Sequence, residues 1–246
     1  MAKCYFDSAD YKGSMDAALD LALQCIYKAV STLDITCVEI IVPTQANFSI
    51  IEYSLRNIGW TKMGKINLHN DNYPVNLILG TVNSNLHIDT SAVIYYGLDS
   101  DQIFKVEEGN STKIQIAIKE YADISLWGKT YNVQCLSNHA KDLHRDALSI
   151  KCEKAIDEVN FACNMTHKFA FHTSDEKLVK TYIRALHKYE PSLVNPDAMF
   201  EYGKGKYGWP LALANQLKRW VEMVNKGNLK GGDRTTSTLL AHYQRW

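Results

Sequence analysis

The sequence has no net charge, because 27 Lys and Arg residues balance 27 Asp and Glu residues over 246 positions. A neutral chain has no overall field that would steer it toward nucleic acid, a membrane surface or an anionic substrate. No apolar run approaches the roughly 20 residues that a membrane-spanning helix needs. The first residues lack the basic-then-apolar plan of a signal peptide, so a cytoplasmic location is the expectation.

The common catalytic and metal-binding motifs are also missing. The six cysteines form no Cys-x-x-Cys pair. The spacing among Cys152, Cys163, His167 and His172 does not match a zinc motif, so no metal is expected. The chain has no Gly-x-Gly-x-x-Gly, Walker loop or Gly-x-Ser-x-Gly sequence. These absences leave no catalytic residue or cofactor to name, and the sequence does not decide whether the protein is an enzyme.

What is present is the composition of a globular protein whose charge is unevenly distributed. Hydrophobic residues make up 46% of the chain and charged residues 22%, which excludes a disordered chain. Residues 1–138 hold 10 Lys and Arg against 15 Asp and Glu, whereas residues 201–246 hold 8 against 3. An acidic first part and a basic end are therefore concealed by the neutral total.

The first part alternates between helical and strand patterns. Ser14 is placed to cap a helix over 14–31 with a regular apolar stripe. Residues 36–42 are almost continuously apolar, which is typical of an interior parallel strand. Residues 112–120 alternate between isoleucines and polar residues, which predicts an edge strand with one face in water. The other elements expected here are helices at 47–58 and 99–107 and strands at 75–82, 92–98 and 131–136.

Glu39 interrupts the apolar run of residues 36–42. A buried carboxylate there would need a partner or a shifted pKa. We expect instead that Glu39 lies at the margin of the sheet and points outward.

The second part has only helical patterns. Four helices are expected: one over about 140–163, one opened by a capping box at Thr173 and running to 188, one starting near Pro210, and one over 236–245. The sequence therefore predicts an α/β fold with a Rossmann-like parallel or mixed sheet covered by helices in residues 1–138. An all-helical domain with a basic C-terminal segment follows in residues 139–246.

Polar residues follow two of the predicted strands. Thr44, Asn47 and Ser49 come after the strand at 36–42, and Asp99 and Asp101 come after the strand at 92–98. Ligands of open parallel sheets bind beyond the carboxyl ends of the strands. If these strands are neighbours, the five residues could line one crevice and bind a small anionic or nucleotide-like ligand. The alternative is that Thr44, Asn47 and Asp99 only cap helices.

The basic end of the chain supports a second hypothesis. Lysines and arginines interleave there with tyrosines and tryptophans, a combination that can bind nucleic acid. Lys230 and Arg234 lie in a glycine-rich loop before a helix and could contact phosphate. The same loop could equally be a linker with an ordinary Thr or Ser cap, and Trp220 falls on an apolar helical stripe. A third hypothesis is that the protein is an interaction subunit that binds no small ligand.

Two resemblances can be stated. The stretch from Gly13 to Leu19, together with Asn47 to Trp60, resembles the second half of the acetyl-CoA-dependent N-acetyltransferases, a resemblance that extends over residues 13–82. That family carries a glycine-bearing pyrophosphate loop before its long helix. Residues 11–15 lack the paired spacing, so common descent is not inferred. The plan around Val93 to Gly97, Val159 to Asn164 and Gly208-Trp209 is similar to uncharacterised bacterial α/β proteins of this length, which implies no activity.

Overall fold

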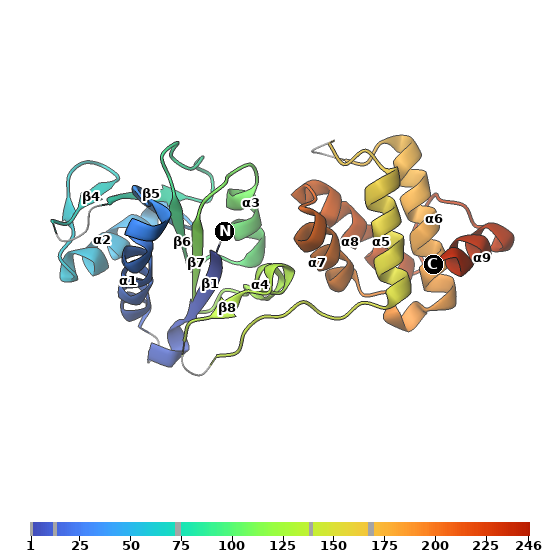
Figure 1. Ribbon diagram of the computed structural model, residues 1–246, viewed down its shortest axis with the longest axis horizontal. Helices are drawn as coiled ribbons and strands as arrows, with labels where there is room; N and C mark the ends of the chain where they lie inside the picture. The colour runs from blue at the N-terminus through green and yellow to red at the C-terminus, as the bar shows by residue number, and fades with distance from the viewer. Residues whose placement is uncertain (1, 12–13, 72–74, 138–139, 167–169) are drawn as a thin grey trace. The chain divides into compact units, whose positions relative to one another are not determined.

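The computed structural model of the protein describes residues 2–11, 14–71, 75–137, 140–166 and 170–246 (Figure 1). The chain forms two compact units. The first, here called the sheet unit, contains residues 1–128 and 132–143, and the second, the helical unit, contains residues 129–131 and 144–246. The predicted fold class, an α/β fold followed by a helical region, is confirmed. The predicted domain boundary between 138 and 139 stays a prediction.

Within the described residues, eight strands form one mixed sheet in the order β3-β4-β5-β2-β6-β7-β1-β8. The six strands from β5 to β8 in this order are parallel, and β4 is antiparallel to both β3 and β5. The strands are β1 (Ala2–Asp7), β2 (Cys37–Val42), β3 (Thr61–Lys62), β4 (Asn67–His69), β5 (Asn76–Thr81), β6 (Ala92–Tyr96), β7 (Ile114–Lys119) and β8 (Gln134–Cys135). The interior position predicted for residues 36–42 is confirmed, because β2 lies between β5 and β6.

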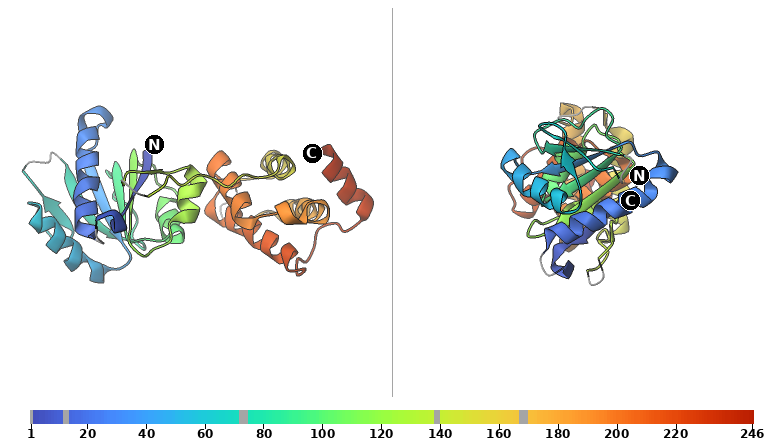
Figure 2. Two further views of the ribbon diagram at one scale, coloured as in Figure 1. Left: turned by 90° about the horizontal axis from the view of Figure 1, so that it is seen from below. Right: turned by 90° about the vertical axis from the view of Figure 1, so that its left-hand side faces the viewer.

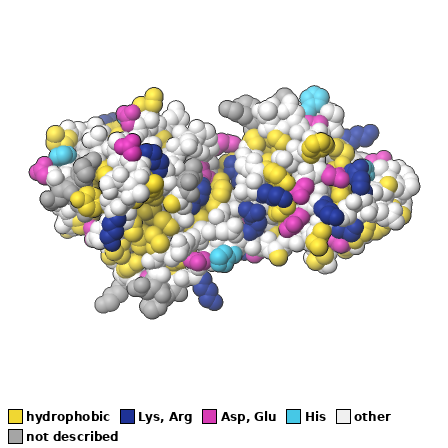
Figure 3. Space-filling model, in the orientation of Figure 1, with side chains coloured by type: hydrophobic (Ala, Val, Ile, Leu, Met, Phe, Trp, Pro, Cys, Tyr) yellow, Lys and Arg dark blue, Asp and Glu magenta, His cyan; other side chains and the backbone are white. Residues whose placement is uncertain are grey.

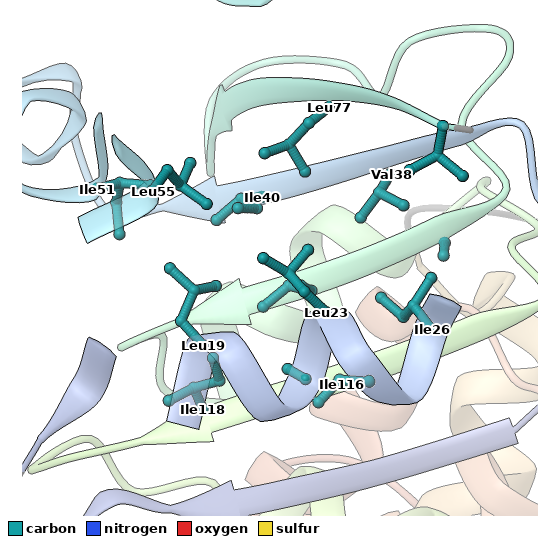
Figure 4. Close-up of a cluster of buried hydrophobic side chains, with 14 of the residues drawn as sticks. Leu19, Leu23, Ile26, Val38, Ile40, Ile51, Leu55, Leu77, Ile116 and Ile118 are labelled. Atoms are coloured by element: carbon teal, nitrogen blue, oxygen red, sulfur yellow. The ribbon is translucent and has the colours of Figure 1, made fainter. Parts of the chain in front are cut away.

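Helices cover both faces of the sheet. They are α1 (Met15–Leu33), α2 (Phe48–Asn57), α3 (Ser100–Glu107) and α4 (Ser125–Tyr131), with short 3-10 turns at Ser8–Tyr11 and Gln45–Asn47. On one face, Leu19 and Leu23 of α1 pack with Ile40 of β2 in a large buried cluster (Figure 4). On the other face, Lys3 of β1 pairs with Glu107 of α3, and the Tyr95 ring of β6 lies 6.1 Å from that of Trp127. Figure 2 shows α1 and α3 on opposite sides of the sheet.

Local signals account for the predicted helix ends. The Ser14 side chain accepts a hydrogen bond from the backbone N–H of Ala17 at 3.2 Å and so caps α1, as expected. Asp34 ends the helix in the left-handed conformation, with φ of 49°. Both ends of this long helix are thus set by residues next to it in the sequence.

The prediction that residues 112–120 form an edge strand is wrong. β1, for which the sequence predicts no strand, pairs along the whole of β7 and, with β6 on the other side, makes β7 an interior strand. Gln115, which was expected to face water, is 1% exposed. Its side chain accepts a hydrogen bond from Lys3 Nζ at 2.6 Å and donates one to Thr112 Oγ1 at 3.2 Å. The polar alternation of β7 is therefore satisfied by other side chains rather than by solvent.

In residues 144–246, the described part of the chain forms five α-helices rather than the predicted four, with a short 3-10 turn at Pro191–Leu193. They are α5 (Ile150–Ala162), α6 (Thr173–Tyr189), α7 (Pro196–Tyr207), α8 (Leu211–Asn225) and α9 (Thr236–Arg245). Helix α6 packs on both α8 and α9, and α7 packs on α5 and α8 (Figure 2). The helices predicted from Thr173, from near Pro210 and over 236–245 are confirmed as α6, α8 and α9.

Three details of this unit were predicted incorrectly. Helix α5 begins at Ile150 rather than near 140, because Ser149 caps it by accepting from the Cys152 N–H at 3.2 Å. The cap of α6 is His172 rather than Thr173. Helix α7 was missed although Asn195 caps it and Pro196 occupies its first turn. Its apolar stripe is obscured in the sequence by charged residues, of which Glu201 is 1% exposed.

The burial of Glu201 makes the stability of the helical unit depend on pH. Burial raises the pKa of Glu201 to about 7, although the carboxylate accepts the Asp146 N–H at 3.1 Å. Since the folded pKa lies above the unfolded one, this group favours folding below the unfolded pKa and loses that contribution as the pH rises through about 7. We expect the free energy of unfolding, measured with urea, to fall less between about pH 5 and 8 in Glu201→Gln than in the native chain. The same dependence on pH in both proteins would contradict this.

Candidate functional site

The carboxyl ends of β2 and β6 form a topological switch point. The two strands are parallel neighbours, with Val38 opposite Ala92 and Ile41 opposite Tyr95. After β2 the chain enters α2, whose Ile51 and Leu55 join the cluster on the face of α1. After β6 it enters α3, which lies on the opposite face. Loops that diverge in this way leave room between them for a ligand in open α/β sheets.

The loop after β2 carries the first group of predicted site residues. Thr44 donates from both its backbone N–H and its hydroxyl to Asn47 Oδ1, at 3.1 and 2.9 Å. The hydroxyl of Ser49 lies 3.4 Å from the Ala46 carbonyl oxygen. The Asn47 side chain gives no cap bond to α2. Thr44 and Ser49 are exposed, so this loop presents hydroxyl groups and the beginning of a helix to solvent.

The loop after β6 carries the second group. Asp99 caps α3: its Oδ1 accepts the Gln102 N–H at 2.9 Å, and its own N–H donates to Gln102 Oε1 at 3.1 Å. Asp101 lies in the first turn of α3, exposed. The capping alternative considered for Asp99 is thus observed, and Asp101 is left with its carboxylate in solvent.

Other carboxylates lie along the same edge of the sheet. Asp7 ends β1 and pairs with Lys119 at the end of β7, at 3.1 Å. Asp16 in the first turn of α1 accepts a hydrogen bond from the Ser54 hydroxyl of α2. At this edge the carboxylate of Asp7 is neutralised by Lys119, whereas Asp101 is exposed. An anionic group is therefore favoured over the neutral loop after β2, and hydrogen-bond donors are favoured near Asp101.

The prediction that Glu39 points outward at the sheet margin is wrong. The residue is 2% exposed at the centre of β2. Its Oε2 accepts hydrogen bonds from the His87 N–H at 2.9 Å and the Thr90 hydroxyl at 2.8 Å. A Cβ atom on Gly80 of the neighbouring β5 would overlap Glu39 Oε1, so glycine at that position makes room for the carboxylate. The β5–β6 connection supplies the partners that a buried carboxylate requires.

A pocket of about 350 Å³ lies beside the amino ends of β2 and β5. Its lining includes Cys37, His69, His87 and Asp89. Burial raises the pKa of the Cys37 thiol to about 11, so the thiol is neutral at physiological pH and is not an activated nucleophile. His69 Nε2 lies 3.0 Å from Asp71, and His87 Nδ1 lies 3.7 Å from Asp89. Sequence reasoning missed this pocket, because its residues come from four separate segments.

Metal and membrane sites can be assessed for the described residues. Their His, Cys, Asp and Glu side chains form no group of three or more that could hold a metal ion. His167, one of the residues considered for zinc, lies outside the described part of the chain, and Cys152 and Cys163 are buried. No helix among the described residues has the length and apolar character required to cross a membrane.

The basic residues near the end of the chain are largely committed to contacts within the helical unit. Lys206 pairs with Asp157 at 3.1 Å, Lys218 pairs with Asp197 at 2.7 Å, and the buried Lys204 donates to the Trp209 carbonyl at 2.9 Å. Trp220 is buried. On the face shown in Figure 3, Lys and Arg side chains are interspersed with Asp and Glu rather than gathered in one field. Lys230 and Arg234 are exposed in the loop between α8 and α9.

The fold and the site define a protein with a mixed α/β sheet, a switch point at β2 and β6, and a helical unit. Residues 151–246 match the model of a domain of unknown function (DUF1889), which here covers most of α5 and all of α6 to α9. No curated protein and no solved structure matches the chain. The resemblances to N-acetyltransferases and to bacterial α/β proteins therefore stay predictions.

Proposed function

We propose that the sheet unit binds a small nucleotide-like ligand at the carboxyl ends of β2 and β6. The observation that carries the proposal is that these neighbouring strands lead into helices on opposite faces of the sheet. The anionic group of the ligand would lie over the loop containing Thr44, Asn47 and Ser49. Its hydroxyl groups would donate to Asp99 and Asp101, because carboxylates only accept hydrogen bonds. We assign no catalytic residue and no cofactor.

The test is a thermal-shift screen against nucleotides, dinucleotides and acyl-CoA, followed by the double variant Asn47→Ala, Asp99→Ala. A ligand at a hundred times its Kd stabilises the folded state by about 2.7 kcal/mol. We expect the double variant to abolish this ligand-dependent shift. Loss of the Asp99 cap alone costs about 1 kcal/mol, so the readout is the shift and not the melting temperature itself.

Asn195→Ala is the matched control, because it removes an observed helix cap from α7 in the helical unit. It should lower the melting temperature and leave the ligand-dependent shift unchanged. A shift that survives in the Asn47, Asp99 variant would contradict the proposed site. The absence of a shift with every ligand would favour a subunit that acts by protein interactions.

A further inference from the structure

The helical unit contains a pocket of about 360 Å³ between α6, the end of α8, the loop after α8 and the beginning of α9. Arg184, His187 and Lys188 line it from α6, and Arg234 lines it from the loop. The rest of the lining is apolar or glycine: Val224, Gly227, Leu229 and Leu239. No Asp or Glu is among the described residues that line it. The pocket therefore combines positive charge with apolar surface.

Arg184 is held in position by the loop that closes the pocket. Its Nε donates to the Gly231 carbonyl oxygen at 2.9 Å, and a terminal nitrogen donates to the Leu229 carbonyl oxygen. Burial and the positive charge of Arg234 lower the pKa of Arg184. Two guanidinium groups therefore share a partly buried site without a carboxylate between them, an arrangement that a bound anion would stabilise.

The Arg234 side chain, unlike that of Arg184, is not held by hydrogen bonds to the loop in the described residues. It is exposed, and its guanidinium makes no hydrogen bond or ion pair within the described part of the chain. Asp233, its neighbour in sequence, instead accepts the Thr235 N–H at 2.7 Å at the start of α9. Lys188 Nζ is fixed nearby by a 2.9 Å hydrogen bond to Thr236 Oγ1. The preference of helix C-termini for cations explains His187 and Lys188 but not Arg234, which is on a loop.

We propose that this pocket binds a phosphate monoester that carries an apolar body. Guanidinium and ammonium groups bind the phosphate oxygens, the former through paired N–H donors. Val224, Leu229 and Leu239 line the rest of the pocket, so an apolar body would lie against them, a contact that free phosphate could not make. The site lies in the other unit from the strand-end site and does not depend on it.

The experiment is isothermal titration calorimetry of the full chain with phenyl phosphate, inorganic phosphate and benzyl alcohol. We expect phenyl phosphate to bind more tightly than inorganic phosphate and benzyl alcohol not to bind. Arg234→Gln should raise the Kd for phenyl phosphate about tenfold, which is the effect of losing one charge-assisted hydrogen bond. Lys226→Gln is the matched control, because Lys226 is exposed at the start of the same loop but does not line the pocket.

Equal weakening by Arg234→Gln and Lys226→Gln would overturn the proposal, since it would show only a general effect of charge. No binding of phenyl phosphate would overturn it as well. Inorganic phosphate binding as tightly as phenyl phosphate would refute the apolar part of the ligand. Both substituted side chains are exposed, so an unchanged melting temperature will show that each variant is folded.

Discussion

Replacement of Gly80 by Ala is expected to lower the free energy of unfolding of the sheet unit by about 3 kcal/mol or more. The new Cβ atom would overlap Glu39 Oε1 and lie 2.7 Å from Ile41 Cδ1. The carboxylate cannot move aside without losing its hydrogen bonds to His87 and Thr90. Overpacking and the disruption of a buried charged group therefore act together. Urea unfolding combined with hydrogen exchange of peptides from β2 and β5 measures the loss.

Gly64→Ala is the control for this substitution, because a Cβ atom at Gly64 meets nothing within 4 Å. It should leave stability almost unchanged. In a Glu39→Ala background, Gly80→Ala should lower the free energy of unfolding by less than it does in the native chain. The clash with Glu39 is then absent, and only the clash with Ile41 remains. If Gly80→Ala were as mild as Gly64→Ala, the carboxylate would not occupy the space that the glycine leaves.

Trp209→Ala is expected to destabilise the helical unit by about 3–5 kcal/mol, as removal of a large buried side chain does. Trp209 is 1% exposed, and its ring lies 6.1 Å from that of Phe171 in an edge-on arrangement. The ring also fills the space beside Gly203, where a Cβ atom would approach it to 2.8 Å. Its Nε1 donates to Asn160 Oδ1 at 2.9 Å. Urea unfolding and hydrogen exchange of α7 and α8 would report the change.

Phe161→Ala provides the matched control, because Phe161 follows Asn160 on α5 and is 93% exposed. Removing this ring should change stability little. Trp209→Phe should fall between the two, since it keeps an aromatic ring and loses the hydrogen bond to Asn160. A loss with Trp209→Ala no greater than with Phe161→Ala would contradict the central place of Trp209 in this core.

The elements that were predicted correctly are those whose signals are local. The apolar run of β2 and the cap and stripe of α1 each lie within one continuous segment of the chain. β1 has the same length as β2 but no continuous apolar run, because it contains Lys3, whose partners Gln115 and Glu107 lie far along the chain. Glu39 was misjudged for the same reason: its partners His87 and Thr90 lie about 50 residues away.

The candidate sites show the same limit. That Asp99 caps α3 follows from Gln102 three residues later. That β2 and β6 are neighbours depends on strand pairing and could not be read from either segment alone, and the common site beyond them stays a prediction. Arg234 was a candidate for phosphate from its glycine-rich loop. Arg184 and Lys188 could not be predicted as phosphate contacts. In the sequence they belong to the polar face of α6, and only the folded loop makes them part of a pocket.

The pairing of β1 also constrains how the chain folds as it is synthesised. Its partners are β7 and β8, and Lys3 and Gln115 are separated by 112 residues. At a ribosomal rate of about 5–20 residues per second, β1 is synthesised roughly 6–22 s before β7 is complete. During that interval Tyr5 and Phe6, both buried in the finished sheet, have no strand to pack with. Pairing of β1 with β7 is therefore a late event in the synthesis of this unit, and the apolar side chains of β1 stay without their strand partners until then.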